Sequence, residues 1–388
     1  PDIMIEDQVF DYRTHQVFGI PGEPFIMEEG IPAVPQVSRF YRIPNTGSVE
    51  LVLSNTDYEL LENVDVMPWQ EEGSDHFGLA RSSAFDQNQW YPPVVAEMSE
   101  PMILRDFRIV RVALYPVQVN PVTRQARVYH NLSCEIVASD QPGVNEITTP
   151  RRPTGSWVPI YRDMIENLDD SALDQATETP GVYMIMRKNV AGTREWADSL
   201  YQWKKRKGFD VIIDSTHTAS AAQMITYIRS VYATDASLEF VCLIGDPDWA
   251  SGLPVDGGNY DHSYALGNTG DDLEDIGVGR LSGDGGSQMA TINAKIMGYE
   301  RNPHMETSGG EPDTMWFNRG LFYAGICPTW HIISNYRAMQ WGAQQFRNWT
   351  GVDCTYVHSF DCHWSLTLAQ NYLSLGVSFF LIRPSWQY

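Results

Sequence analysis

The chain has 388 residues, 43% of them hydrophobic, with 49 acidic against 27 basic side chains and a formal net charge of −22. This length predicts two domains, each with a core of its own. The strong negative charge disfavours nucleic acid and anionic membrane surfaces as partners, and no apolar run reaches the ~18 residues of a membrane span.

The first 145 residues have the pattern of β-structure. Apolar and polar residues alternate in SVELVLSNTDYELL (48–61) and in RDFRIVRVALYPVQV (105–119), as in strands with one buried face. Scattered prolines exclude long helices here. The stretch Asn120-Pro121-Val122-Thr123 predicts the turn of a hairpin. We therefore expect residues 1–145 to form an all-β sandwich, without a catalytic constellation.

Residues 146–180 read as a linker, because they are rich in proline and acidic residues. Within it, a short helix is expected from Ile160 to Leu168. Arg151-Arg152 is predicted to be an exposed dibasic pair, which could be a processing site or an ordinary solvated pair.

From Gly181 to the last residue, short apolar strands alternate with amphipathic helices. The expected strands are GVYMIMR (181–187), FDVIIDS (209–215), LEFVCLIGD (238–246), RGLFYAGI (319–326), VDCTYVHSF (352–360) and VSFFLIR (377–383). Such alternation predicts a three-layer α/β domain with a mostly parallel sheet covered on both faces. Ligands bind beyond the carboxyl ends of strands in such sheets, so function is expected after Asp246, Ile326, Phe360 and Arg383.

Carboxylates gather in the segment that follows the third of these strands. They are Asp246, Asp248, Asp261, Asp271, Asp272 and Asp275. Ca²⁺ takes six to eight oxygen ligands from flexible loops, so Asp246, Asp261, Asp271 and Asp272 are candidate calcium ligands. The same residues could instead cap helices or only extend the acidic surface, and the ligand spacing of an EF-hand loop is absent.

Cysteine and histidine occur close together at two places. Cys354, His358 and Cys362 would share one face of a strand, but strand rise separates them by ~13 Å per four residues, too far for one zinc ion. Cys327 and His331 form the best local Cys–His pair, with a packed cysteine before a proline turn as the alternative.

Cys242 stands in the middle of an apolar strand. We expect it to be buried and unreactive.

Several segments together resemble the gingipain family of caspase-like cysteine peptidases. YMIMRKNVAGTREWADSLYQWKKRKGFDVIIDST is similar to the family's opening strand, its helix ending in Trp-Lys-Lys-x-x-Gly and its next strand. FVCLIGDPDW, YDHSYALGNTGDD and DIGVGRLS resemble its Val-Gly-Asp strand end, its Ser-Asp-x-x-Tyr loop and its Ile-Gly-Arg strand. INAKIMGYERNP is similar to the following helix, and YPVQVNPVTRQARVYHNLSCEIV to part of the family's pro-domain.

The resemblance implies a secreted cysteine peptidase made with a β-rich pro-domain and often stabilised by calcium. The domains would then be a pro-domain at 1–145, the linker at 146–180 and the first part of a peptidase domain at 181–388. Laid on the family without gaps from Gly376, the family's histidine position falls on Ser385 and its acidic position falls near Cys327. The nucleophilic cysteine would follow the next strand, beyond residue 388, so the sheet is expected to be incomplete at its C-terminal end and the dyad is not present in this chain.

Two functions stay open on this evidence, and a third fits less well. The chain is the N-terminal portion of a gingipain-like peptidase that hydrolyses protein or peptide substrates. Alternatively it is an inactive relative, a secreted or cell-surface structural or filament subunit, because a serine hydroxyl at position 385 cannot take the place of an imidazole as a base. A periplasmic binding module would explain neither the pro-domain nor the aspartate spacing. The apolar strand near the end should pair with further polypeptide, from a C-terminal continuation or a second copy. No organic cofactor is expected.

Overall fold

The computed structural model describes most of the chain as far as Arg301 and selected elements after it. The described residues are 2–10, 12–70, 79–235, 237–257, 261–268, 270–301, 307–308, 311–312, 320–325, 342–344, 347, 356–360 and 379–383. Within them, no helix is long and apolar enough to cross a membrane.

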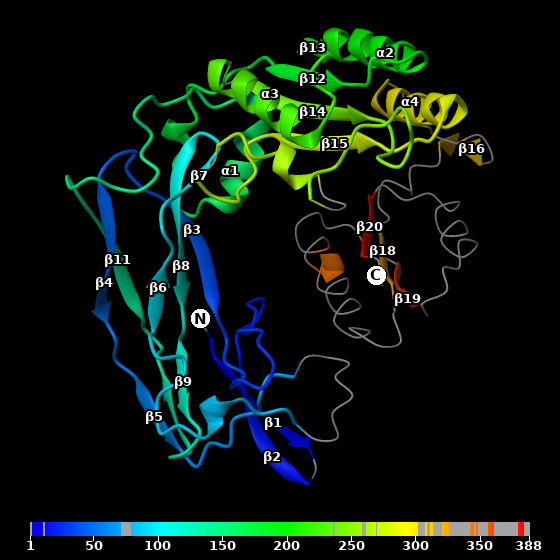
Figure 1. Cartoon of the computed structure of the whole chain (residues 1–388). Helices are drawn as coiled ribbons and strands as arrows, with labels where there is room; N and C mark the ends of the chain where they lie inside the picture. The colour runs from blue at the N-terminus through cyan, green and yellow to red at the C-terminus, as the bar shows by residue number, and fades with distance from the viewer. Residues whose placement is uncertain are drawn as a thin grey trace.

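The N-terminal part consists of antiparallel sheets, as the alternating pattern predicts (Figure 1). Its strands are β1 (Met4–Phe10), β2 (Arg13–Gly19), β3 (Val37–Arg42), β4 (Ser48–Asn55), β5 (Glu59–Glu62), β6 (Ala96–Met98), β7 (Met102–Leu104), β8 (Phe107–Leu114), β9 (Val117–Asn120), β10 (Gln125–Val128) and β11 (Ser133–Ser139), with a 3-10 turn η1 (Ser83–Phe85). They pair as β1-β2, β5-β10-β9, β11-β4 and β3-β8-β6, and β7 also pairs with β8.

The hairpin predicted around residues 120–123 is confirmed. β9 and β10 pair antiparallel with Asn120 opposite Gln125, so residues 121–124 form the turn. The Asn120 side-chain oxygen accepts hydrogen bonds from the backbone N–H groups of Val122 and Thr123, both at 3.2 Å. This is the local side-chain bond that makes asparagine a turn residue.

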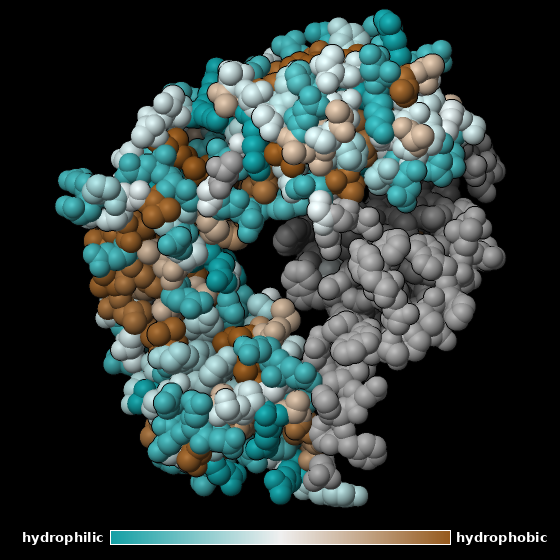
Figure 2. All heavy atoms as spheres, in the orientation of Figure 1, coloured by the Kyte–Doolittle hydropathy of each residue, from teal (hydrophilic) through white to brown (hydrophobic). Residues whose placement is uncertain are grey.

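The core of this part lies between its sheets. Phe18, Val117, Val119 and Val128 are buried in one cluster, and Val110 and Val112 of β8 are buried in a neighbouring one. Outside the core, Figure 2 shows hydrophobic residues gathered over β4 and β11, where Val52, Leu53 and Val137 are exposed.

The segment 146–180 packs firmly against the β-rich part. It contains η2 (Gly155–Trp157), α1 (Val158–Met164) and η3 (Asp170–Ala172). Trp157 and Tyr161 are buried in one cluster with Phe107 of β8. The helix predicted over 160–168 begins and ends earlier, because Pro159 suits the first helical turn and Ile165 forms a β-bridge with Phe40.

The Arg151 part of the dibasic prediction is wrong. The Arg151 guanidinium lies 4.1 Å from the centre of the Tyr232 ring, and the residue is half-buried. Arg152 is exposed, and its Nε donates to the carbonyl of Gln175. An arginine stem packs well on an aromatic face, which the linker composition gives no sign of.

The next part is a three-layer α/β unit, as predicted. Its elements are β12 (Val182–Met186), α2 (Thr193–Arg206), β13 (Asp210–Asp214), α3 (Ala221–Thr234), β14 (Leu238–Ile244), η4 (His262–Tyr264), β15 (Gly277–Leu281) and α4 (Gly286–Arg301). The four strands are parallel in the order β13-β12-β14-β15. Met184 and Met186 of β12 pack with α3 residues, whereas Ile185 packs with residues of α2 and α4. The alternate residues of one strand therefore face opposite layers.

The strands after α4 form sheets of their own. β16 (Thr307–Ser308) and β17 (Glu311–Pro312) are a small antiparallel pair, while β18 (Gly320–Gly325), β19 (Tyr356–Phe360) and β20 (Phe379–Arg383) are parallel in the order β19-β18-β20. These three strands were predicted, and Gly342–Gln344 and Arg347 are helical as the pattern of 337–349 indicates. The parallel strands thus divide into two sheets, a division that periodicity does not encode.

Candidate active-site edge

The carboxyl ends of β12, β13, β14 and β15 form the edge at which an α/β sheet carries its chemistry. A partly buried ion pair connects the β14 and β15 ends of this edge. The Nε and Nη2 atoms of the Arg280 guanidinium donate to the two oxygens of the Asp261 carboxylate, at 2.8 and 2.7 Å. Arg280 also donates to the carbonyls of Gly245, Leu253 and Pro254. The arginine of the Gly-Arg motif therefore cross-links β15 to the loop after β14.

Gly245 makes the sharp turn that ends β14. Its φ is +101°, and a Cβ there would lie 2.6 Å from the Cα of Gly252. Only glycine accepts both the left-handed backbone and this close approach. Asp246 follows, and its Oδ1 accepts from the backbone N–H of Asp248 at 3.0 Å, which closes the loop. Gly245 and Asp246, the Gly-Asp pair of the sequence motif, therefore form the turn that ends β14.

An oriented histidine that the sequence analysis does not single out lies just after β13. The His217 Nδ1 is 2.9 Å from Asp214 Oδ1, and the ring stacks on Tyr227 at 3.9 Å between centroids. Burial alone would raise the pKa of Asp214, but hydrogen bonds from the His217 ring and backbone outweigh it and lower that pKa. The pattern Asp-x-x-His after a strand could have suggested this pair.

The four candidate calcium ligands do not gather at one point. Asp261 is bound by Arg280, and Asp246 closes its own loop. Asp271 Oδ2 accepts from the backbone N–H of Ile103 in β7 at 2.6 Å, so it faces the β-rich part, and Asp272 follows it in the chain. Among the described residues, no three His, Cys, Asp or Glu side chains are placed to hold one metal ion. Calcium binding stays a prediction.

Asp271 and Asp275 follow Asp246 in one acidic segment of the sequence, but they lie at the opposite, amino end of the sheet. The segment after β14 starts at the carboxyl edge but must return to the amino end before β15 can run parallel. Asp275, two residues before β15, is fully buried there, and its burial raises its pKa to about 6 against the hydrogen bonds from Asn268 and from the backbone of Arg105.

The described cysteines do not have the environment of a nucleophile. Cys242 is buried, as predicted, and burial raises its pKa to about 11. Burial also raises the pKa of Cys134 in β11. A thiolate nucleophile needs the opposite shift.

The two positions that the resemblance marks in the peptidase part lie just past strand ends. β18 and β20 pair in parallel with Ala324 opposite Arg383, so their carboxyl ends lie side by side. Cys327 and Ser385 follow these ends, and both lie outside the described residues, as do His331, Cys354, Cys362 and His363.

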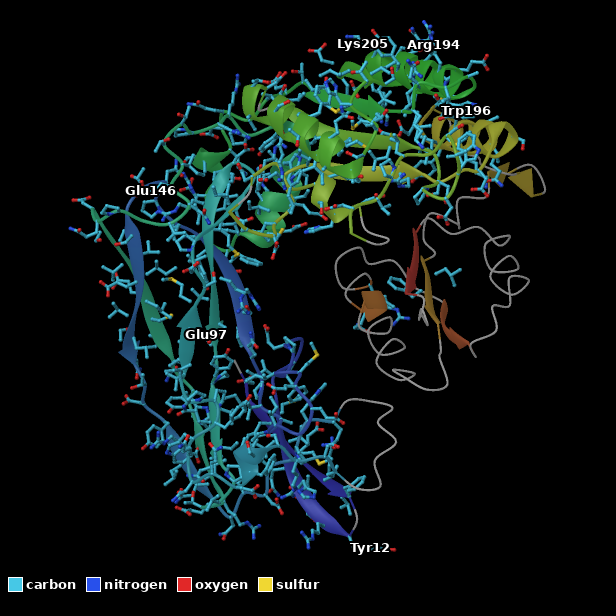
Figure 3. The ribbon with its side chains drawn as sticks, viewed as in Figure 1. Tyr12, Glu97, Glu146, Arg194, Trp196 and Lys205 are labelled. Atoms are coloured by element: carbon cyan, nitrogen blue, oxygen red, sulfur yellow. The ribbon has the colours of Figure 1, made fainter. Side chains whose placement is uncertain are left out.

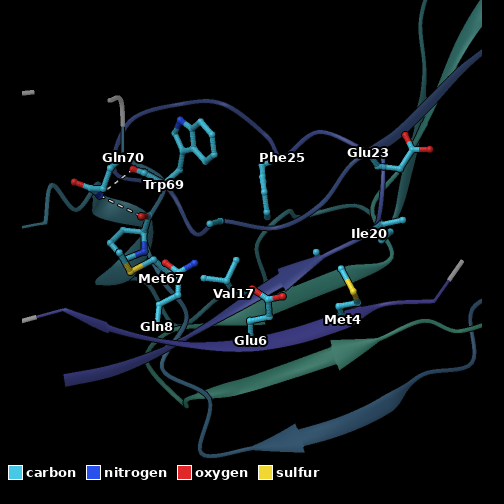
Figure 4. A pocket seen from close by; sticks show the side chains of 13 residues that line it. Met4, Glu6, Gln8, Val17, Ile20, Glu23, Phe25, Met67, Trp69 and Gln70 are labelled. Atoms are coloured by element: carbon cyan, nitrogen blue, oxygen red, sulfur yellow. Dashed lines mark hydrogen bonds between the residues drawn. The ribbon is translucent and has the colours of Figure 1, made fainter. Parts of the chain in front are cut away.

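A second feature of the surface is an open cavity in the β-rich part (Figure 4). Its volume is about 450 Å³, and residues of the β1–β2 hairpin and of the segments near Phe25 and Trp69 line it. Met4, Phe25 and Trp69 make it largely apolar. The cavity lies away from the carboxyl edge of the parallel sheet, and no nucleophile lines it.

Helices α2 and α4 cover the face of the parallel sheet opposite to α3, and one carboxylate links them. Glu300 of α4 accepts from Trp203 Nε1, Lys204 Nζ and Lys207 Nζ at 2.8, 2.8 and 2.9 Å. Burial alone would raise the pKa of Glu300, but these bonds lower it to about 2. Arg194 and Lys205 of α2 point outward (Figure 3). The Trp-Lys-Lys-x-x-Gly motif is therefore a helix-packing motif.

The β-rich N-terminal part and the parallel α/β part each match a family model. Residues 5–149 match the model of the C25 propeptide, and residues 175–351 match that of peptidase family C25. The chain belongs to peptidase family C25 and carries a C25 propeptide.

The chain is similar to gingipains at low sequence identity. The chain is 24% identical to Gingipain R2 of Porphyromonas gingivalis over 295 residues, which cover 71% of this chain and 39% of that protein. It is 22% identical to Lys-gingipain of the same species over 360 residues, 86% of this chain and 20% of that protein. The chain therefore spans less than two fifths of the length of these relatives.

Solved structures of the group were also matched. The complex of Porphyromonas gingivalis RgpB pro- and mature domains shows 22% identity and a TM-score of 0.38, covering 43% of this chain and 87% of that chain. The Arg-specific cysteine proteinase gingipain R gives 14% identity and a TM-score of 0.37, covering 53% of this chain and 46% of that chain. The fold assignment above stands on the sheets and helices of this chain itself.

Proposed function

We propose that this chain is the propeptide and the first part of the catalytic domain of a secreted cysteine peptidase. Peptide bonds would be cleaved by a Cys–His dyad, with the nucleophilic cysteine contributed by sequence that follows residue 388. The observation that carries the proposal is the match of residues 175–351 to the peptidase family, on a parallel sheet with an organised carboxyl edge. Substrates are proteins or peptides, and calcium is a candidate stabiliser of the acidic loops.

The chemistry of the described cysteines supports a nucleophile elsewhere. Cys242 is buried with its pKa raised to about 11, so it is protonated at neutral pH and closed to a substrate. A dyad also needs an imidazole that accepts the thiol proton. His217 follows β13, the edge strand of the four-stranded sheet, and it is held by Asp214. Cys242 lies on β14 and Cys134 lies on β11, so neither cysteine is on the strand next to His217.

The second candidate is an inactive relative that serves as an extracellular structural subunit. The observation in its favour is Ser385, which stands at the family's histidine position in the ungapped resemblance. A serine hydroxyl does not accept a proton near neutral pH, so a peptidase with serine there would lack its base.

The test is labelling of the full-length gene product with a cysteine-directed peptidyl probe, under reducing conditions and with calcium present. The peptidase proposal predicts stoichiometric labelling that prior alkylation abolishes. A product that is folded by circular dichroism, and that neither labels nor cleaves a mixed peptide library, would favour the structural subunit instead.

A further inference from the structure

The side chain of Arg105 extends from the β-rich part into the α/β part. Arg105 and Asp106 form the two-residue turn between β7 and β8, in which Leu104 pairs with Phe107. Arg105 has a φ of +51°, a left-handed conformation that favours glycine or asparagine over arginine. Arg105 is nevertheless 1% exposed. A long charged side chain at a strained turn and fully out of water indicates a specific binding role.

Arg105 donates hydrogen bonds to residues at the beginning of two strands of the parallel sheet. Its backbone N–H donates to Asp275 Oδ1 at 3.0 Å. Its Nη1 donates to the carbonyl of Asp275 at 2.6 Å and to the carbonyl of Leu238 at 2.9 Å. Leu238 is the first residue of β14, and Asp275 lies just before β15. Next to it, Ile103 N–H donates to Asp271.

Aromatic rings enclose the guanidinium from two further elements. Its carbon lies 5.1 Å from the Trp157 ring centre and 5.6 Å from that of Tyr232. Trp157 belongs to the segment before α1, and Tyr232 belongs to α3. Cation–π contacts of this kind are strongest where water is excluded.

The surrounding charges favour a cation at this point. Asp106, Glu239 and Asp275 are buried around the turn, with Arg151 as the other nearby cation. Tyr161 donates to Asp106 at 2.6 Å, and Ser156 donates to Glu239. Loss of Arg105 would leave three buried carboxylates with one half-buried arginine, and a buried charge without a partner is strongly destabilising.

We propose that Arg105 is the anchor that docks the propeptide onto the peptidase part, at the amino ends of β14 and β15. The seven residues of β14 separate this point by about 20 Å from the carboxyl edge that carries Gly245 and Asp246. The anchor therefore holds whether or not anything occupies that edge. Figure 1 shows β7 and α1 beside the end of the sheet where these strands begin. The inference uses the propeptide assignment of the proposed function but none of its chemistry.

The test cuts the connection and measures whether the two parts stay together. A recognition site for a specific protease is inserted in the full chain between Thr148 and Thr149, which are exposed and precede Arg151. After cleavage, sedimentation velocity at falling concentration gives the dissociation constant of the two fragments. The unsubstituted protein is expected to remain a complex, and Arg105→Met is expected to raise that constant at least a hundredfold.

The matched control is Arg111→Met on β8, the strand that follows the turn with Arg105. The Arg111 side chain is 40% exposed and its Nη2 lies 3.9 Å from a Glu97 carboxylate oxygen, a weak ion pair, so its loss should leave the constant within threefold. Should uncut Arg105→Met fail to fold by near-ultraviolet circular dichroism, Arg105→Lys replaces it, with an expected rise of at least tenfold.

Fragments of Arg105→Met or Arg105→Lys that bind as tightly as the unsubstituted ones would overturn the proposal, as would unsubstituted fragments that separate at once. Because the measurement is of binding, a product that never labels with the peptidyl probe can still confirm the anchor.

Discussion

The contact between α2 and α4 gives the sharpest prediction for stability. Glu300 accepts hydrogen bonds from Trp203, Lys204 and Lys207, and its side chain is 20% exposed. The downward shift of its pKa from 4.5 to about 2 corresponds to about 3 kcal/mol at 1.36 kcal/mol per pKa unit. Solvent screens the contact to Lys207, which is 40% exposed, so we expect Glu300→Gln to lower the free energy of unfolding by about 1–2 kcal/mol at pH 7.

The pH dependence of this effect has a defined sign. The folded pKa of Glu300 lies below the unfolded value, so the carboxylate contributes its full stabilisation above pH 4.5 and loses it as the pH falls towards 2. Urea unfolding of the parent protein and of Glu300→Gln, at a series of pH values from 7 to 3, measures the difference. Glu195→Gln, at an exposed position near the start of α2, is the control and should change little. A difference below 0.3 kcal/mol at pH 7, or one that does not shrink below pH 4.5, would refute the reasoning.

Three further predictions concern the parallel sheet and its acidic loops. Asp261→Asn should lower the free energy of unfolding by about 2–3 kcal/mol, because the Arg280 side chain is 7% exposed and would lose its charged partner. A urea titration that shows no loss of stability would contradict this. Cys242 should react with a small thiol reagent at neutral pH only after unfolding, since its pKa is raised to about 11 by burial, and mass spectrometry of the labelled native protein checks it. If the acidic loops bind calcium, a chelator should lower the melting temperature by several degrees, and an unchanged melting temperature would contradict calcium binding.

The sequence predicts those features that depend on local periodicity and turn chemistry. The β9–β10 hairpin follows from alternation on both sides of an asparagine–proline turn, and the structure contains it. The strands and helices of the α/β part follow from short apolar runs between amphipathic segments, and the burial of Cys242 follows from its place in such a run.

Features that depend on long-range contacts were beyond the sequence. Asp271 and Asp275 look like one acidic loop with Asp246, yet the return of the chain to the amino end of β15 places them with Ile103 and Arg105. Arg105 itself looks like an ordinary strand residue in an alternating stretch, and only the tertiary structure shows its turn and its burial. Arg151 likewise looks solvated until α3 supplies the Tyr232 ring.

The most direct test of the central claim is to locate the residue that reacts in the full-length gene product. The product is labelled with the cysteine-directed peptidyl probe, digested and mapped by mass spectrometry. We expect one modified cysteine, in sequence that follows residue 388, with Cys134 and Cys242 unmodified. Modification of Cys134 or Cys242, or no modification of a folded product, would contradict it.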